Sequence, residues 1–173
     1  IEDGNSKPPF FYIIPARRGD YLTATEMLRK LSLAGVKIFR LKKNALVQDR
    51  LFNEGDFCIP LSQPCRRYIK ELFDIHTYDA NAKGRPGDVS TWNMPMLMGV
   101  DYFPVTERAQ LELEEVSELS LSGDVNVPDG CDCYAFPCSF NHSFALVQRL
   151  LDAGVDVYVM DGWGGEGAPT RRG

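Results

Sequence analysis

The feature that most constrains this chain is a strand-helix-strand pattern in its first quarter. Residues 10–14 form an uninterrupted apolar run, which is typical of a strand buried on both faces. A helix follows, with a capping-box pair at Thr23 and Glu26, and Gly35 stands where a left-handed C-terminal cap belongs. Its apolar residues recur at helical spacing: Ala24, Met27, Leu28, Leu31 and Ala34. Residues 36–41 supply a second strand, so the pattern predicts a parallel pair with a right-handed crossover.

The pattern returns near the C-terminus, and a further strand lies between the two copies. Residues 133–137 lead into a helix that ends at Gly154, and residues 156–160 form the next apolar strand. The similarity is either a weak internal repeat or two units that meet the same packing problem. Residues 57–61 are another apolar strand, and the helix after it starts near Pro64 and turns four residues inward: Tyr68, Ile69, Leu72 and Phe73. Strands that alternate with helices predict an α/β fold with a mainly parallel sheet flanked by helices.

Length and composition favour one domain with a substantial core. The chain has 173 residues, of which 44% are hydrophobic and 25% charged, so it is long enough to bury a core and is not of a disordered class. It begins at Ile1 without a methionine, and we interpret it as a single α/β domain, residues 1–173, excised from a longer protein. Residues 1–9 are expected to be a linker, residues 79–88 and 107–130 loops or connectors, and residues 162–173 a glycine-rich tail.

The charge and hydropathy patterns exclude two classes of partner. The formal net charge of −5 argues against nucleic acid, because a basic excess supplies most of the affinity for phosphate backbones. No apolar run reaches the roughly 18 to 20 residues that a membrane-spanning helix needs. The acidic residues after Glu107, with apolar residues between them, are interpreted as a solvated edge element or a connector rather than a binding tail.

The cysteines do not form a recognisable metal site. Cys131, Cys133, Cys138 and His142 lie close together in the sequence, but their spacing is not that of the familiar zinc fingers or ribbons. We interpret these cysteines, and Cys58 in the strand at 57–61, as small buried hydrophobic residues, and expect no metal or other cofactor in this chain.

Nor does the sequence contain a recognisable catalytic centre. Gly162, Gly164 and Gly167 spell GxGxxG, but the chain ends before the helix and the acidic residue that a dinucleotide site requires. A nucleophilic Cys138 with His142 as its base would need a strained elbow, and no GxCxG motif is present.

A ligand-binding crevice is the remaining possibility, because open parallel sheets bind ligands beyond the carboxyl ends of their strands. Six polar residues follow the predicted strands and form the candidate site: Arg17, Arg18, Gln63, Ser139, Asn141 and His142. The alternative is that these residues serve turns and caps, with Ser139 or Asn141 capping the last helix.

Three segments resemble the region that follows the catalytic domain in large secreted bacterial zinc carboxypeptidase-like proteins. They are residues 55–64 (GDFCIPLSQP), 67–73 (RYIKELF) and 88–100 (DVSTWNMPMLMGV). In that family a strand of the type GSYVVPxxQP, a helix and a segment of the type YDVTxWxLPxxMGV occur in this order. The resemblance spans residues 10–105, and residues 133–160 more loosely.

The resemblance implies a non-catalytic domain of class I glutamine amidotransferase-like, flavodoxin-like three-layer fold. It implies a secreted or periplasmic accessory role beside a peptidase domain of the same polypeptide, which would carry the zinc, and it transfers no catalytic residue to this chain. Two alternatives remain: a stand-alone module that binds a small ligand or a peptide terminus, and a Cys/His hydrolase of the amidotransferase type.

Overall fold

The computed structural model describes residues 6–16, 19–75, 93–119 and 133–160. The chain divides into two compact units, Ile1–Asn126 and Val127–Gly173, and each is described by itself. Among the described residues, no helix is both long and apolar enough to cross a membrane.

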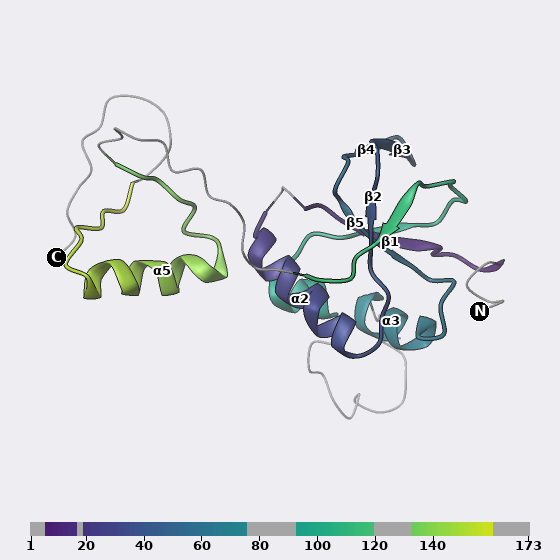
Figure 1. Cartoon of the computed structure of the whole chain (residues 1–173), viewed down its shortest axis with the longest axis horizontal. Coiled ribbons are helices and arrows are strands. Elements are labelled where there is room, and N and C mark those ends of the chain that lie inside the picture. The colour runs from purple at the N-terminus through teal and green to yellow at the C-terminus, as the bar shows by residue number, and fades with distance from the viewer. Residues whose placement is uncertain (1–5, 17–18, 76–92, 120–132, 161–173) are drawn as a thin grey trace, which may run out of the picture. The chain divides into compact units, whose positions relative to one another are not determined.

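The first unit contains a five-stranded sheet with the order β6-β1-β5-β2-β7 and a separate hairpin, β3-β4 (Figure 1). The strands of the sheet are β1 (Phe11–Ile14), β2 (Phe39–Leu41), β5 (Phe57–Pro60), β6 (Phe103–Val105) and β7 (Leu113–Glu115). The hairpin consists of β3 (Ala45–Val47) and β4 (Arg50–Phe52). The helices of this unit are α2 (Tyr21–Leu33), α3 (Arg66–Phe73) and α4 (Met94–Met98).

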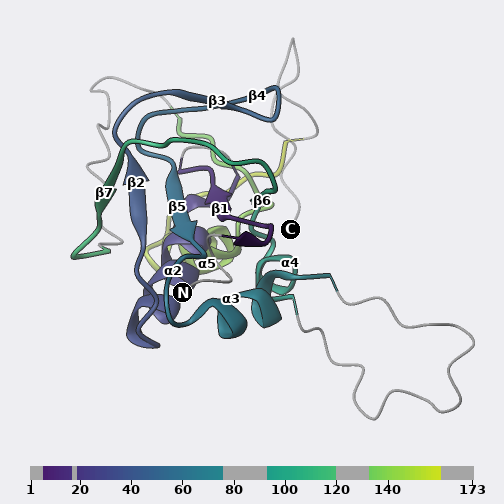
Figure 2. The ribbon, with the colours of Figure 1, turned by 90° about the vertical axis from the view of Figure 1, so that its right-hand side faces the viewer.

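The prediction of a mainly parallel sheet, and with it the flavodoxin-like three-layer fold, is wrong, because every pairing in the sheet is antiparallel. β1 and β2, which flank α2, do run in the same direction, since each is antiparallel to β5. However, β5 lies between them (Figure 2). A crossover helix fixes the direction of its two strands but leaves room for a later strand to enter between them.

Without the hairpin, the short helix α4 and β7, the element order β1-α2-β2-β5-α3-β6 is the β-α-β-β-α-β order of a ferredoxin-like, split βαβ arrangement. The hairpin β3-β4 is an addition between β2 and β5, and β7 is an addition at the outer edge of β2. β6 is the opposite edge strand, and this position accommodates Pro104, because an edge strand has one side without a ladder partner.

The predicted burial of β1 on both faces is confirmed, and β5 is buried on both faces as well, although the two covering layers differ. Successive side chains of a strand point to opposite faces, so Tyr12 and Ile14 pack with α2 and α3 while Ile13 packs with the hairpin. Figure 1 shows these helices on one side of the sheet and β3-β4 on the other. The continuous apolar run therefore predicted correctly that both faces of the strand are buried. A layer of helices covers one face, and a hairpin covers the other.

Helix α2 begins three residues earlier than the proposed capping box. Asp20 is its N-cap, and the Asp20 carboxylate accepts hydrogen bonds from Thr23 N (3.0 Å) and Thr23 Oγ1 (2.6 Å). Glu26 instead pairs with Arg29 and Lys30 on the helix surface. The proposed C-terminal cap is confirmed: Gly35 has φ +86°, and Val36 N donates to Leu31 O in a Schellman motif.

The second unit contains α5 (Asn141–Asp152), and its helix end repeats that of α2. Gly154 has φ +73° and Val155 N donates to Leu150 O, so the likeness between the two copies includes a shared helix ending. The strands predicted at 133–137 and 156–160 do not form, apart from an isolated bridge at Val159. In α5 only Ser143 is buried.

A polar network fastens β1 to the end of α3 and the start of α4. Tyr12 is 1% exposed, stacks on Phe73, and its hydroxyl donates to Asp74 Oδ1 at 2.6 Å. Asn93 Nδ2 and the Tyr102 hydroxyl both donate to the carbonyl of Phe73, at 2.6 and 2.7 Å. Burial, and then the hydrogen bond to the Asp74 carboxylate, raises the pKa of Tyr12 well above its usual value.

Replacing Tyr12 with Phe should keep the ring stack and remove only the hydroxyl, at a cost of about 1 kcal/mol in the free energy of unfolding at pH 7. The raised pKa adds a pH dependence. The Tyr12 hydroxyl stabilises the folded state fully when the pH is below about 10, the pKa of the phenol in the unfolded chain. This stabilisation is lost as the pH rises further, because the phenol ionises in the unfolded chain before it ionises in the folded one. Urea unfolding between pH 7 and 11 measures both effects. An advantage of the wild type over Tyr12→Phe that stayed constant above pH 10 would contradict the assignment.

Candidate functional site

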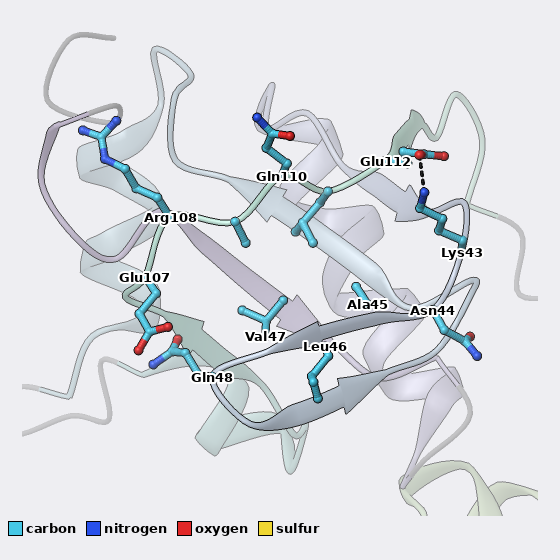
Figure 3. A pocket seen from close by; sticks show the side chains of 12 residues that line it. Lys43, Asn44, Ala45, Leu46, Val47, Gln48, Glu107, Arg108, Gln110 and Glu112 are labelled. Carbon is cyan, nitrogen blue, oxygen red and sulfur yellow. Dashed lines mark hydrogen bonds and ion pairs between the residues drawn. The ribbon is translucent and has the colours of Figure 1, made fainter.

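The first unit contains a pocket of about 330 Å³ between two extended stretches of chain (Figure 3). One wall is residues 43–48, which include β3, and the other is residues 107–112, which lead into β7. This volume lies at the small end of the range for ligand pockets.

The two walls are tied together at both ends of the pocket. At one end Lys43 Nζ forms an ion pair with Glu112, and Lys42 N donates to Glu112 O at 2.9 Å. At the other end the Gln48 side chain bonds Thr106 twice: Thr106 N donates to Gln48 Oε1 at 2.8 Å, and Gln48 Nε2 donates to Thr106 Oγ1 at 2.9 Å. The pocket is therefore a slot closed at its ends rather than an open channel.

The floor of the pocket is apolar and belongs to the core on the hairpin side of the sheet. Val47 is buried, and Ala45, Ala109 and Leu111 pack against the same cluster as Ile13 and Cys58. The hairpin is held over this face by β4, where the Arg50 guanidinium lies 3.7 Å from the centre of the Phe103 ring. Two of the four floor residues are alanines, and their small side chains leave space between the walls.

The charges that line the pocket are balanced. Lys43 and Arg108 are basic, and Glu107 and Glu112 are acidic. Lys43, together with the weaker field of Lys42, lowers the pKa of Glu112, so this carboxylate stays ionised and paired. The Arg108 guanidinium lies 5.4 Å from the centre of the Phe10 ring.

The six predicted ligand-binding residues fall in different parts of the chain, and each part is described by itself. Arg17 and Arg18 lie outside the described residues, Gln63 belongs to the first unit, and the remaining three belong to the second: Ser139, Asn141 and His142. Because antiparallel strands end alternately at opposite edges, a common carboxyl-end crevice is no longer expected.

Gln63 is buried, and its side-chain amide replaces part of the ladder between β2 and β5. Continuing the register of Phe39 with Cys58 by two residues places Pro60 opposite Lys37, but a proline has no N–H to donate. Gln63 Nε2 instead donates to Lys37 O (3.2 Å) and to Pro60 O (2.7 Å), while Gln63 Oε1 accepts from Lys37 N (2.9 Å). The amide thus stands between the two strands like an additional peptide group.

The three predicted residues of the second unit lie at the start of α5. Ser139 is exposed in the turn before the helix, and Asn141 and His142 are its first two residues, both exposed. Neither Ser139 nor Asn141 is the N-cap, because Phe140 holds that position. Ser143, buried in the first turn, donates from its hydroxyl to Pro137 O at 2.6 Å.

The cysteines differ in environment more than the sequence suggested. Cys58 is buried in β5 as expected, and burial raises the pKa of its thiol to about 12. Cys133 and Cys138, in contrast, are exposed, while Cys131 lies outside the described residues. Across the ranges that the structure describes, no group of three or more His, Cys, Asp or Glu side chains is arranged to hold a metal ion.

Sequence reasoning missed the pocket because it overlooked the hairpin. The turn residues Gln48 and Asp49 both have positive φ, +50° and +56°, in a two-residue loop that usually carries Asn or Gly. The available signal was weaker: the apolar stretch ALV and the stretch RLF, with two apolar residues, lie on either side of a polar pair.

Comparison of the chain with protein-family models, with curated proteins and with solved structures finds no match in any of the three. The comparisons therefore neither support nor oppose the resemblance to zinc carboxypeptidase-like proteins.

Replacing Gln63 with Ala should destabilise the first unit by about 2 to 4 kcal/mol, because backbone groups of Lys37 and Pro60 lose their partners in a buried place. Gln63→Glu should cost a similar amount, since a carboxylate oxygen would face two carbonyl oxygens. Urea unfolding measures both variants.

The control for this prediction is Gln110→Ala, at an exposed position of the same unit, which should change stability by less than about 0.5 kcal/mol. If Gln63→Glu were as stable as the wild type, the amide would not have the structural role assigned to it.

Proposed function

We propose that this chain is a non-catalytic accessory domain of a secreted or periplasmic zinc carboxypeptidase-like protein, and that it supports the peptidase domain or its substrate cleft. The proposal rests on the resemblance of three segments, and the position of these segments in the core supports it. The zinc and the catalytic residues belong to the neighbouring domain in this proposal.

The observation that carries the proposal is where the resembling segments lie. Residues 55–64 span β5 and the turn that contains Gln63, residues 67–73 lie in α3, and residues 93–100 contain α4. These elements supply much of one core: Ile59, Leu61, Ile69, Phe73 and Val100. The family pattern PxxQ coincides with Pro60 and Gln63, whose amide completes the ladder between β2 and β5.

The resembling residues therefore form the scaffold of the domain. A resemblance of this kind is expected when a domain is retained for its shape and its contacts. The described parts of the resembling segments form strand pairs, core contacts and helix caps. Every fully buried side-chain nitrogen or oxygen in the described residues has a hydrogen-bond partner. The amidotransferase-like fold that the resemblance implied is not retained in the proposal, because the sheet is antiparallel.

The test begins with the gene. The proposal requires that the residues encoded before Ile1 contain an HxxE motif and a later histidine, and their absence would refute it. In that longer polypeptide, Gln63→Ala destabilises this domain, and Ser32→Ala, at an exposed position of α2 away from the pocket, is the control.

If the domain supports the peptidase, Gln63→Ala should lower the thermal midpoint of the peptidase domain or raise its KM for a peptide substrate at saturating zinc, and Ser32→Ala should change neither. Equal midpoints and equal KM values in the wild type and both variants would contradict a supporting role.

A further inference from the structure

We propose that the pocket between residues 43–48 and 107–112 binds a short, uncharged, extended peptide segment, which adds to the free edge of β3. This inference goes beyond the accessory role and does not depend on which domain adjoins the chain. It rests on the hydrogen-bonding pattern of the hairpin, the bonds that tie the walls at both ends, the apolar floor and the balance of charge.

The hairpin leaves one edge of β3 available for another strand. In the described part of the chain β3 pairs with β4 alone, with Val47 opposite Arg50 and Leu46 opposite Leu51. Val47 and Arg50 flank the two-residue turn, so they form the hydrogen-bonded pair and the next pair is not hydrogen-bonded. The N–H and C=O of Leu46 therefore point away from β4, along the edge that lines the pocket.

The opposite wall does not supply hydrogen-bond partners for the N–H and C=O of Leu46. Among the described residues no backbone hydrogen bond joins 44–47 to 107–111, and the ties lie only at the ends, through Glu112 and through Gln48. Tied at both ends but unpaired between them, the walls form a slot whose length is limited to a few residues. Addition of a strand to an exposed edge is a general mode of peptide binding, in which main-chain hydrogen bonds supply affinity.

The floor determines which side chains the segment carries. Alternate residues of a strand point to one face, and the floor under the slot is formed by Ala45, Val47, Ala109 and Leu111. Figure 3 shows Ala45 and Val47 directed toward the space between the walls. Small apolar side chains at alternate positions of the segment match this floor.

The lining favours a segment that carries no charged groups. Two basic and two acidic residues line the pocket, and one of each, Lys43 and Glu112, already pair with each other. A charged segment would gain little from this balanced lining and would lose its hydration on entering.

Backbone strain lies beside the slot. Gln48 and Asp49 hold left-handed conformations that cost an L-residue about 1 kcal/mol or more each, and Gln48 is kept there by its two hydrogen bonds to Thr106. These are the bonds that tie the walls at that end. The left-handed turn is therefore bonded directly to the opposite wall.

The test is a titration of the ¹⁵N-labelled full chain with the capped tetrapeptide acetyl-Ser-Val-Ser-Ala-amide, followed by amide chemical shifts. Saturable shifts should appear at residues 44–47 and 107–111. The same peptide with free, charged termini should bind more weakly. An absence of saturable shifts at millimolar peptide, or tighter binding of the charged form, would overturn the proposal.

Two matched variants locate the contact. Leu46→Pro removes the N–H that faces the pocket, and Leu51→Pro makes the same substitution at the paired position on the outer edge of β4. Both positions are exposed, at 72% and 56%. Leu46→Pro should weaken binding about tenfold and Leu51→Pro less than twofold. Equal effects of the two variants would overturn the assignment of the β3 edge.

A third variant keeps the test decisive if proline disturbs the hairpin. Ala109→Leu narrows the slot from the opposite wall and should weaken peptide binding about tenfold, with amide shifts of β1 and β5 checking that the sheet is intact. Unchanged binding by a folded Ala109→Leu would refute the slot as the binding site.

Discussion

The insertion of β5 between β1 and β2 is the constraint on which the rest of the first unit depends. β5 provides the central ladder, and both of its faces are buried, one beneath α2 and α3 and the other beneath the hairpin. A proline at the end of a central strand would ordinarily break a ladder bond. In this sheet Leu61 N donates to Phe10 O, which places Pro60 at a non-hydrogen-bonded position toward β1, and the Gln63 amide supplies the missing bonds toward Lys37.

Much of the local structure was predictable, because it depends on neighbouring residues. The strands around residues 11–14 and 57–60, the helix that ends at Gly35 and the burial of Cys58 are all present. The direction of β2 relative to β1 was also correct. The pairing partner was not predictable in the same way, because apolar runs report burial on two faces and are the same whether a helix or a hairpin covers the second face.

The predicted site was derived from the predicted fold and shares its basis. The six predicted residues were grouped by a rule for parallel sheets, which has no application once the strands alternate in direction. Gln63 looked like a ligand-binding side chain because it is polar and follows a strand, whereas its amide bonds the backbone. The pocket depends on a tertiary approach of residues 43–48 to 107–112, which are far apart in sequence, and on a turn at Gln48-Asp49 without the usual glycine.

The most direct test of this fold is whether β5 is the neighbour of both β1 and β2. In a non-hydrogen-bonded antiparallel pair the Cα atoms lie about 4.5 Å apart, and the two Hα atoms give a strong nuclear Overhauser effect. The register predicts such effects between Ile13 and Cys58 and between Arg40 and Phe57. Observation of both would place β5 in the centre. Their absence, with contacts between β1 and β2 in a parallel pattern instead, would contradict the antiparallel sheet with β5 at its centre.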